Sequence, residues 1–304
     1  MDARIRGSLL GTALGDSLGL PMEGLSKERN AKLFPGPLRQ RLWFGRGALS
    51  DDTLQTLMVV EALRLHPNDP SAFAVEFARR LRRWFWSFPP GIGLSTAKAC
   101  LRLSVGIPVS RCGVASGGNG AAMRSAIIGV FFAHEPSKRR EFVDASARVT
   151  HTLPIATHGA QLIALAAACS ALGSPDLFDR DCKDIAPEWD FQAPWPDRGP
   201  SGYVLHSVNA VLKVWRRHPS SLPDALDAAV RLGGDTDSVG AMVGGIVGAT
   251  HSDVPAAWLS WLGYPQPKTL CDGAMPSYML LLASHLVQLP IVLAHGFRRI
   301  LPPY

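Results

Sequence analysis

Runs of alanine and glycine inside apolar segments constrain the fold of this chain more than any other feature. Residues 164–168 read Ala-Leu-Ala-Ala-Ala, and residues 240–249 read Gly-Ala-Met-Val-Gly-Gly-Ile-Val-Gly-Ala. Small faces of this kind let helix axes approach closely. Helical spacing of apolar residues, without strand alternation, recurs at 54–63, 72–85, 121–132, 159–172, 204–215, 223–232 and 239–249. We therefore expect an all-α fold of compact, orthogonally packed helices.

The domain organisation is expected to be simple. The chain has 304 residues, of which 47% are hydrophobic, and a single core of this size is ordinary. We predict one domain over residues 1–304. Residues 186–202, with four prolines and three acidic residues, predict an irregular loop that acts as a lid or an insertion.

Composition also limits the compartment and the partners. The N-terminal residues lack the apolar segment of a signal peptide, and five cysteines without a CxxC pair favour a reducing cytoplasm. The most apolar window, 278–297, contains His285, Gln288, Pro290 and His295, which are costly in lipid. We therefore expect a buried or surface-lying helix at 278–297 and a cytoplasmic protein without a membrane span. Its net charge of +6 suits an anionic ligand.

Two dense acidic motifs stand directly before apolar helices. The first is Ser50-Asp51-Asp52-Thr53, and the second is Gly234-Asp235-Thr236-Asp237-Ser238. Helix capping accounts for one such motif, but capping needs one side-chain oxygen and each motif supplies two carboxylates and a hydroxyl. Four carboxylates brought together repel unless cations compensate them, and hard oxygen ligands suit Mg²⁺ or Mn²⁺. We predict that the two motifs meet and bind two divalent cations.

A third motif, at residues 11–23, combines glycines spaced by four with Asp16 and Glu23. The glycine spacing favours a close helix contact, and Pro21 ends the helix, so that Glu23 lies in the following loop. We interpret Asp16 as an internal polar anchor or cap. For Glu23, an exposed loop carboxylate and a residue beside the cations are both open.

Two glycine-rich turns lie between the acidic motifs. Residues 116–124 read Ser-Gly-Gly-Asn-Gly-Ala-Ala-Met-Arg, and residues 89–96 read Pro-Pro-Gly-Ile-Gly-Leu-Ser-Thr. A turn that opens a helix can present backbone N–H groups to a phosphate or a sugar. An ordinary turn is the alternative for both segments.

The ordered set of motifs resembles the ADP-ribosylglycohydrolase family. The similarity includes the segments at 11–23, 50–53, 90–96, 118–124, 150–151 and 233–238, and thus spans most of the chain. It implies an all-α hydrolase that uses two Mg²⁺ or Mn²⁺ ions to cleave the bond between C1″ of ADP-ribose and a modified acceptor. The implied partner is an ADP-ribosylated protein or another ADP-ribosyl conjugate, with ADP-ribose as product.

The resemblance also assigns roles to single residues. It implies cation ligands at Ser50, Asp51, Asp52, Asp235, Asp237 and Ser238 and catalytic roles for Glu23, Asp51 and Asp52. It implies ADP-ribose contacts at Gly91, Gly93, Gly118, Asn119, Gly120, Met123 and His151. Threonine is usual in the family at positions 50 and 238, and serine keeps the ligating hydroxyl without the methyl group that stiffens the rotamer.

Three questions stay open at this point. A family member that only binds ADP-ribose would keep the same fold. A nucleic-acid-binding protein would use the basic and aromatic residues at 79–86 and the basic run at 138–140. The spacing at 79–86 more often forms a solvated face over a buried stripe. The acceptor is expected to be of the arginine type, while serine, nucleic acid and small molecules remain alternatives.

Overall fold

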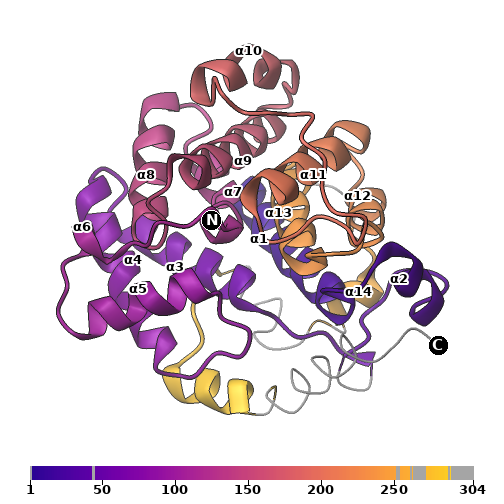
Figure 1. The fold of residues 1–304 in the computed structure, drawn as a ribbon, viewed down its shortest axis with the longest axis horizontal. Coiled ribbons are helices and arrows are strands. Elements are labelled where there is room, and N and C mark those ends of the chain that lie inside the picture. The colour runs from indigo at the N-terminus through magenta and orange to yellow at the C-terminus, as the bar shows by residue number, and fades with distance from the viewer. Residues whose placement is uncertain are drawn as a thin grey trace.

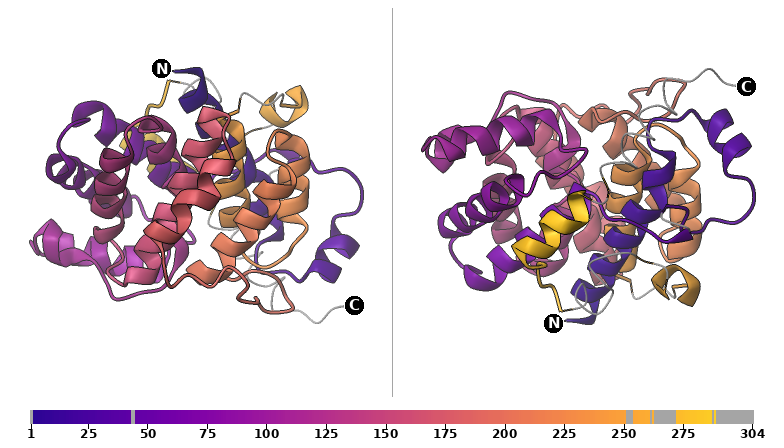
Figure 2. Two further views of the ribbon diagram at one scale, coloured as in Figure 1. Left: turned by 90° about the horizontal axis from the view of Figure 1, so that it is seen from above. Right: turned by 90° about the horizontal axis from the view of Figure 1, so that it is seen from below.

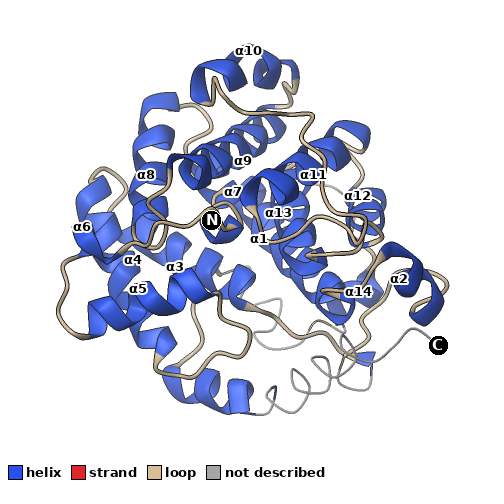
Figure 3. Cartoon of the chain, viewed as in Figure 1, coloured by secondary structure: helices blue, strands red, loops and turns tan. Residues whose placement is uncertain are grey.

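The computed structural model describes residues 2–42, 45–250, 254–260, 262, 272–286 and 288, and this part of the chain is built from helices without a named β-strand (Figures 1 and 3). The all-α prediction is confirmed. The helices are α1 (Ala3–Gly19), η1 (Leu20–Met22), α2 (Lys27–Leu33), α3 (Asp51–Leu65), α4 (Pro70–Phe85), α5 (Leu94–Ser104), α6 (Val109–Cys112), η3 (Asn119–Ala121), α7 (Ala126–Phe131), α8 (Pro136–Arg148), α9 (Pro154–Leu172), α10 (Asp176–Ile185), α11 (Val204–Arg217), α12 (Leu222–Val230), α13 (Thr236–Gly248) and α14 (Ala256–Ser260).

One helix prediction has the wrong bounds. The pattern at 121–132 predicts a continuous helix, but only Ala126–Phe131 is α-helical, after the 3₁₀ turn η3. The backbone between them winds in tighter turns, in which Ser125 N donates to the Ala122 carbonyl at 3.0 Å. The buried guanidinium of Arg124 donates to the carbonyl of Gly120 at 2.6 Å, so a side chain partners a carbonyl that a regular helix would bond through its backbone.

The antiparallel pair α1 and α13 forms the centre of the molecule (Figures 1 and 2). Glycines at four-residue spacing face each other across this contact. A Cβ atom on Gly15 would lie 1.9 Å from the Gly240 carbonyl oxygen, and one on Gly11 would lie 2.0 Å from that of Gly244. The expected close helix contact is therefore present. It brings the C-terminal end of α1 beside the N-terminal end of α13.

Helix α9 is the alanine-rich core helix, and α7, α8, α10, α11 and α13 pack around it. Within the described chain it alone has the length and mean hydropathy of a membrane span, and 78% of its apolar window is buried inside the fold. The apolar surface of α9 is thus used for packing within the protein.

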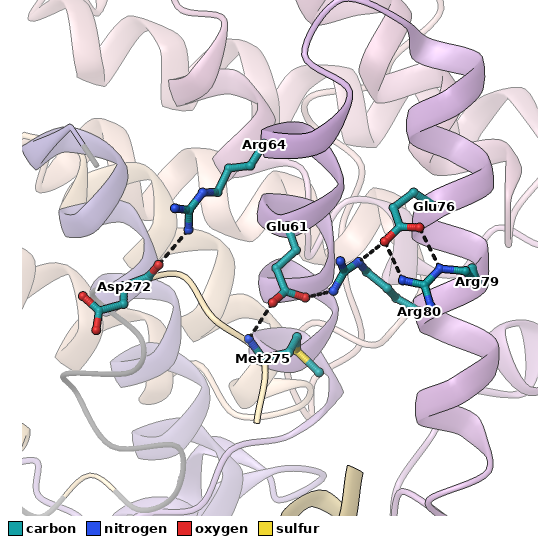
Figure 4. A network of polar contacts seen from close by, with 7 residues as sticks. All are labelled: Glu61, Arg64, Glu76, Arg79, Arg80, Asp272 and Met275. Carbon is teal, nitrogen blue, oxygen red and sulfur yellow. Dashed lines mark hydrogen bonds and ion pairs between the residues drawn. The ribbon is translucent and has the colours of Figure 1, made fainter. Parts of the chain in front are cut away.

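The basic stretch of α4 is engaged in contacts within the fold (Figure 4). Arg79 and Arg80 both pair with Glu76, and Arg80 also pairs with Glu61 of α3. Glu61 accepts in addition the backbone N–H of Met275 at 3.0 Å. These arginines therefore form a structured face over buried residues of the same helix. This agrees with the interpretation of residues 79–86 as a solvated face over a buried stripe.

The C-terminal region contacts α3 and α4 where the structure describes it. Arg64 donates to the Asp272 carbonyl at 2.9 Å (Figure 4), and residues 278–286 are helical with His285 buried. The prediction of a buried or surface-lying helix at 278–297 is met over this part. The remainder of that window and the basic residues at 295–304 lie outside the described residues, with the exception of residue 288.

Candidate active site

A cavity of about 580 Å³ lies where the helix N-termini and the loops predicted to be functional converge. Both acidic motifs and both glycine-rich turns contribute to its wall, together with the loop at 196–202. The predicted site residues that line it are Glu23, Asp51, Asp52, Gly91, Gly93, Gly118, Asn119, Gly120, Met123, His151, Asp235, Asp237 and Ser238. Ser50 is the predicted site residue that is absent from the wall.

Asp16 fixes the start of α3 from the neighbouring helix α1. Its Oδ2 atom accepts hydrogen bonds from Ser50 N at 2.9 Å, Thr53 N at 3.3 Å and Thr53 Oγ1 at 2.5 Å. Free N–H groups at a helix start need such acceptors. The interpretation of Asp16 as an internal polar anchor is therefore confirmed.

Asp52 joins the two acidic motifs. Its Oδ2 atom accepts from Ser50 Oγ at 3.0 Å and, from the other motif, Ser238 Oγ at 3.4 Å. Ser50 also caps α3 by accepting from Asp52 N at 3.2 Å. The motifs thus meet in space although 186 residues separate Asp52 from Ser238.

The start of α13 is held by contacts to two other segments. Thr236 Oγ1 donates to the Gly19 carbonyl at 2.8 Å, and Asp235 N donates to the Pro200 carbonyl at 2.7 Å. Gly234 has a φ of +71° and a Cβ atom there would lie 2.1 Å from the Pro200 oxygen, so the turn needs glycine. Asp235 and Asp237 are thereby fixed at the cavity.

Burial and mutual repulsion raise the pKa values of these carboxyl groups. The pKa of Asp51 is raised to about 7 by burial and by the charges of Asp16 and Glu23. The pKa values of Asp52 and Asp237 are raised well above 3.8 by burial first and then by neighbouring carboxylates. The Oδ1 atoms of Asp52 and Asp237 are buried without a hydrogen-bond partner. Buried acceptors in this state need a proton or a cation.

The carboxylate and hydroxyl groups of the site fit hard cations by their chemistry, although their arrangement is not that of an assembled metal site. In the described part of the chain, no three acidic, histidine or cysteine side chains already converge in an arrangement that could hold a metal ion. The carboxylate and hydroxyl oxygens are of the type that Mg²⁺ and Mn²⁺ prefer. Among the predicted ligands, Asp52 and Asp237 each have a buried Oδ1 atom without a hydrogen-bond partner, and the anchor Asp16 has such an atom as well.

The turn at Gly118–Gly120 uses its glycines to admit the ring of His151. A Cβ atom on Gly120 would lie 2.9 Å from His151 Cε1, and one on Gly118 would lie 3.2 Å from His151 Nε2. Two of the amides expected to face a phosphate already have acceptors, since Gly118 N donates to Ser116 Oγ and Asn119 N to the Gly202 carbonyl. The side chain of Asn119 donates to Asp235 Oδ2 at 2.7 Å and links this turn to the acids.

The second turn contributes a more open part of the wall. Gly91 has a φ of +79°, and Gly93 caps the start of α5 with its backbone. Neither glycine would bring a Cβ atom within 4 Å of another residue. Leu94, which follows, lines the cavity and is 78% exposed. This side of the cavity is therefore its accessible edge.

Several contributors to the site are not recognisable from the sequence motifs. Residues 196–202 of the irregular loop form part of the wall, and the bonds of Pro200 and Gly202 to Asp235 and Asn119 explain why. Gly199 has a φ of +116°, and a Cβ atom there would lie 2.4 Å from the carbonyl carbon of Gly233, so the loop needs glycine at this position. Gln55 and Arg124, which lie behind the wall, donate hydrogen bonds to Asp51 Oδ2 and Gln55 Oε1, respectively.

Comparison with known proteins agrees with this architecture. The family model described as ADP-ribosylglycohydrolase matches residues 1–290. The chain belongs to the ADP-ribosylglycohydrolase family. Its two acidic motifs and both glycine-rich turns lie within the matched range, so the family assignment covers every residue of the cavity wall.

Individual family members are similar over most of their length. An ADP-ribosyl-[dinitrogen reductase] glycohydrolase of Rhodospirillum rubrum is 29% identical over 85% of this chain and 90% of its own. An ADP-ribosylarginine hydrolase of Pseudomonas putida is 26% identical over 86% of this chain and 75% of its own. A solved structure titled ADP-ribosylglycohydrolase-related protein complex has a TM-score of 0.69 at 27% identity and covers 93% of this chain and 97% of its own.

Proposed function

We propose that this ADP-ribosylglycohydrolase removes ADP-ribose from an arginine-type acceptor by a reaction that needs two divalent cations, Mg²⁺ or Mn²⁺. The observation that carries the proposal is the meeting of the two acidic motifs at Asp52, whose Oδ2 atom accepts from Ser50 and Ser238. These hydroxyls and the aspartates at 51, 52, 235 and 237 are the cation ligands of the proposal.

The need for cations follows from the charges in the cavity wall. Burial and mutual repulsion raise the pKa values of Asp51, Asp52 and Asp237, so these groups are not all ionised in the absence of a compensating charge. Bound divalent cations would compensate that charge, orient ribose hydroxyls and make a water molecule a better nucleophile. The buried Oδ1 atoms of Asp52 and Asp237 support this assignment.

The protein's own groups would contribute orientation and proton transfer. Cleavage at C1″ develops positive charge on the ribose, which a negative wall stabilises. Glu23 lines the same cavity and is close enough to raise the pKa of Asp51. We assign to Glu23 the acceptance of a proton from the attacking water or the positioning of that water. The turn at 118–120, Met123 and His151 would hold the ADP-ribose moiety beside it.

The arginine-type acceptor rests on the names of the relatives. One relative is an ADP-ribosylarginine hydrolase and another acts on ADP-ribosylated dinitrogen reductase. An ADP-ribosylated protein is thus the proposed substrate and ADP-ribose the proposed product, in a cytoplasmic setting. The open edge at Leu94 would leave room for a protein acceptor.

The test compares defined conjugates and defined cation states. Wild-type protein stripped with a chelator should release no ADP-ribose from an arginine-linked conjugate, and Mg²⁺ or Mn²⁺ should restore release. Asp51→Asn and Asp237→Asn should each lower kcat/KM by at least about 100-fold, a loss typical of removing a group that stabilises the transition state. Full activity in the stripped protein would refute the cation requirement, and faster release from serine-linked conjugates would refute the arginine preference.

The same assay separates catalysis from binding. A protein that binds ADP-ribose in calorimetry but turns over none of the conjugates would be the non-catalytic family member. If both aspartate variants kept the wild-type rate of hydrolysis, the chemistry would lie elsewhere in the cavity.

A further inference from the structure

Arg124 is a buried cation that the proposed chemistry leaves without a role. Its side chain is 0% exposed, and it lies behind the cavity wall with its guanidinium 4.9 Å from the centre of the Phe77 ring. Burial lowers the pKa of Arg124 to about 9, so the group stays charged at neutral pH. A charge in such a place needs several acceptors, and Arg124 finds them in two directions.

In one direction the guanidinium orients Gln55. Nη1 of Arg124 donates to Gln55 Oε1 at 2.8 Å, and Gln55 Nε2 donates to Asp51 Oδ2 at 2.9 Å. Arginine has only donors, so the oxygen of the amide must face it and the NH₂ group must face Asp51. The orientation of a donor to the first acidic motif is thus set by Arg124.

In the other direction the guanidinium orients His151 through Thr150. Nη2 of Arg124 donates to Thr150 Oγ1 at 2.7 Å, and Thr150 Oγ1 lies 2.8 Å from His151 Nδ1. The threonine proton has two acceptors in reach, His151 Nδ1 at 2.8 Å and the Ala147 carbonyl at 3.5 Å. Because that carbonyl already accepts the backbone N–H groups of Thr150 and His151 at 3.1 and 2.8 Å, the threonine hydroxyl donates its single proton to Nδ1. The ring proton of neutral histidine then lies on Nε2, on the side of the ring near Gly118 of the cavity wall.

The surroundings of His151 agree with a neutral ring. Burial, and then the charge of Arg124, lowers the pKa of His151 to about 3. A neutral ring with a fixed Nε2–H group is a hydrogen-bond donor toward the cavity. Its partner would be an acceptor oxygen, such as those of phosphate and ribose groups.

We infer that Arg124 is a positioning residue that fixes His151 as a donor to ADP-ribose and Gln55 as a donor to Asp51. One guanidinium would thereby align the ligand-binding turn with the first acidic motif. Arg124 also contacts that turn directly, through its bond to the Gly120 carbonyl. The inference rests on the proposed function for the identity of the ligand. The tautomer of His151 does not depend on that function.

The first test measures the tautomer of His151 in the metal-free full chain by ¹⁵N NMR of the histidine rings. The signal is assigned by its loss in His151→Asn. Wild type should show a protonated Nε2 and an unprotonated Nδ1, and Thr150→Val and Arg124→Lys should abolish this preference. A wild-type ring protonated at Nδ1, or a tautomer unchanged in Thr150→Val, would overturn the inference. If Arg124→Lys does not fold, Thr150→Val alone decides.

The second test separates the two arms by binding and turnover. Thr150→Val should weaken ADP-ribose binding in calorimetry by about three- to tenfold, the effect of one hydrogen bond, with kcat little changed. Gln55→Leu should lower kcat and leave ADP-ribose binding unchanged, and Arg124→Lys should do both. Arg139→Lys is the matched control, because Arg139 is a buried arginine of α8 that does not line the cavity, and it should alter neither value.

Failure of the inference differs from failure of the proposed function. A wild-type protein that hydrolyses no ADP-ribosyl conjugate, but shows the Nε2–H tautomer and its loss in Thr150→Val, would refute the function and keep the positioning role. Equal effects of Thr150→Val and Gln55→Leu on both binding and kcat would refute the separate arms, and Arg124 would then be a residue of the core alone.

Discussion

Substitution of Gly15 by alanine tests how the fold brings the acids together. Gly15 lies in α1 at the contact with α13, and an added Cβ atom would lie 1.9 Å from the Gly240 oxygen, 2.2 Å from its carbonyl carbon and 2.8 Å from the nitrogen of Ala241. All three atoms belong to the backbone. They cannot turn aside as a side chain could, so the two helices must separate.

Two opposing effects set the size of the change in stability. Alanine in place of glycine within a helix stabilises the protein by about 1 kcal/mol. Overpacking costs about 1–3 kcal/mol, and rigid backbone neighbours place this site at roughly the upper end of that range. The net expectation is a loss of about 2 kcal/mol, which lowers the melting temperature of a domain of this length by about 3 °C.

Thermal unfolding with and without the substitution measures this effect. Gly93→Ala is the control for melting temperature alone, because Gly93 has no atom within 4 Å of an added Cβ and a φ of −62°. Gly15→Ala should also reduce hydrolysis, since α13 positions Asp237 relative to Glu23. An unchanged or raised melting temperature would refute the reasoning that backbone contact between these helices holds the site together.

Three further predictions follow from single contacts. Asp16→Ala removes the acceptor of three hydrogen bonds at the start of α3, and urea denaturation should show a loss of at least about 2 kcal/mol; a stability equal to wild type would contradict its role as an anchor. Glu61→Gln weakens the pair with Arg80 but keeps an acceptor for Met275 N, and should cost about 1 kcal/mol; no measurable loss would show that the pair adds nothing. In chelated protein the pKa of Asp51 is raised from 3.8 to about 7 in the folded state, so the folded state binds the proton more tightly than the unfolded state. The melting temperature should therefore fall as pH rises through this interval, and Mg²⁺ should reverse the fall. A melting temperature that rises with pH would contradict this prediction.

Local sequence patterns are sufficient to predict the all-α class and to recognise the two acidic motifs. The hydroxyl and carboxylates of Ser50-Asp51-Asp52 precede a long apolar run, and the same arrangement recurs at 235–238. Capping chemistry is local, so it is visible in sequence. The glycine spacing at Gly11 and Gly15 likewise predicts a close helix contact, and the structure has it against α13.

The features that could not be predicted from the sequence depend on contacts between segments far apart in the chain. Arg124 ends a glycine-rich turn and carries no local sign that it contacts Gln55 and Thr150, which come from distant parts of the chain. The same buried side chain interrupts the helix expected at 121–132. The amides of Gly118 and Asn119 were expected to face a phosphate, but their acceptors are Ser116 and Gly202, and the Gly202 contact arises only when the irregular loop closes on the turn.

Calorimetric titration of Mn²⁺ or Mg²⁺ into chelator-stripped protein tests most directly whether the two acidic motifs act as one site. Wild type should bind two ions, and Asp51→Asn and Asp237→Asn, one change in each motif, should each weaken binding. Binding in either variant that equals the wild type would contradict the account, because the carboxylates at the starts of α3 and α13 would then not share the cations.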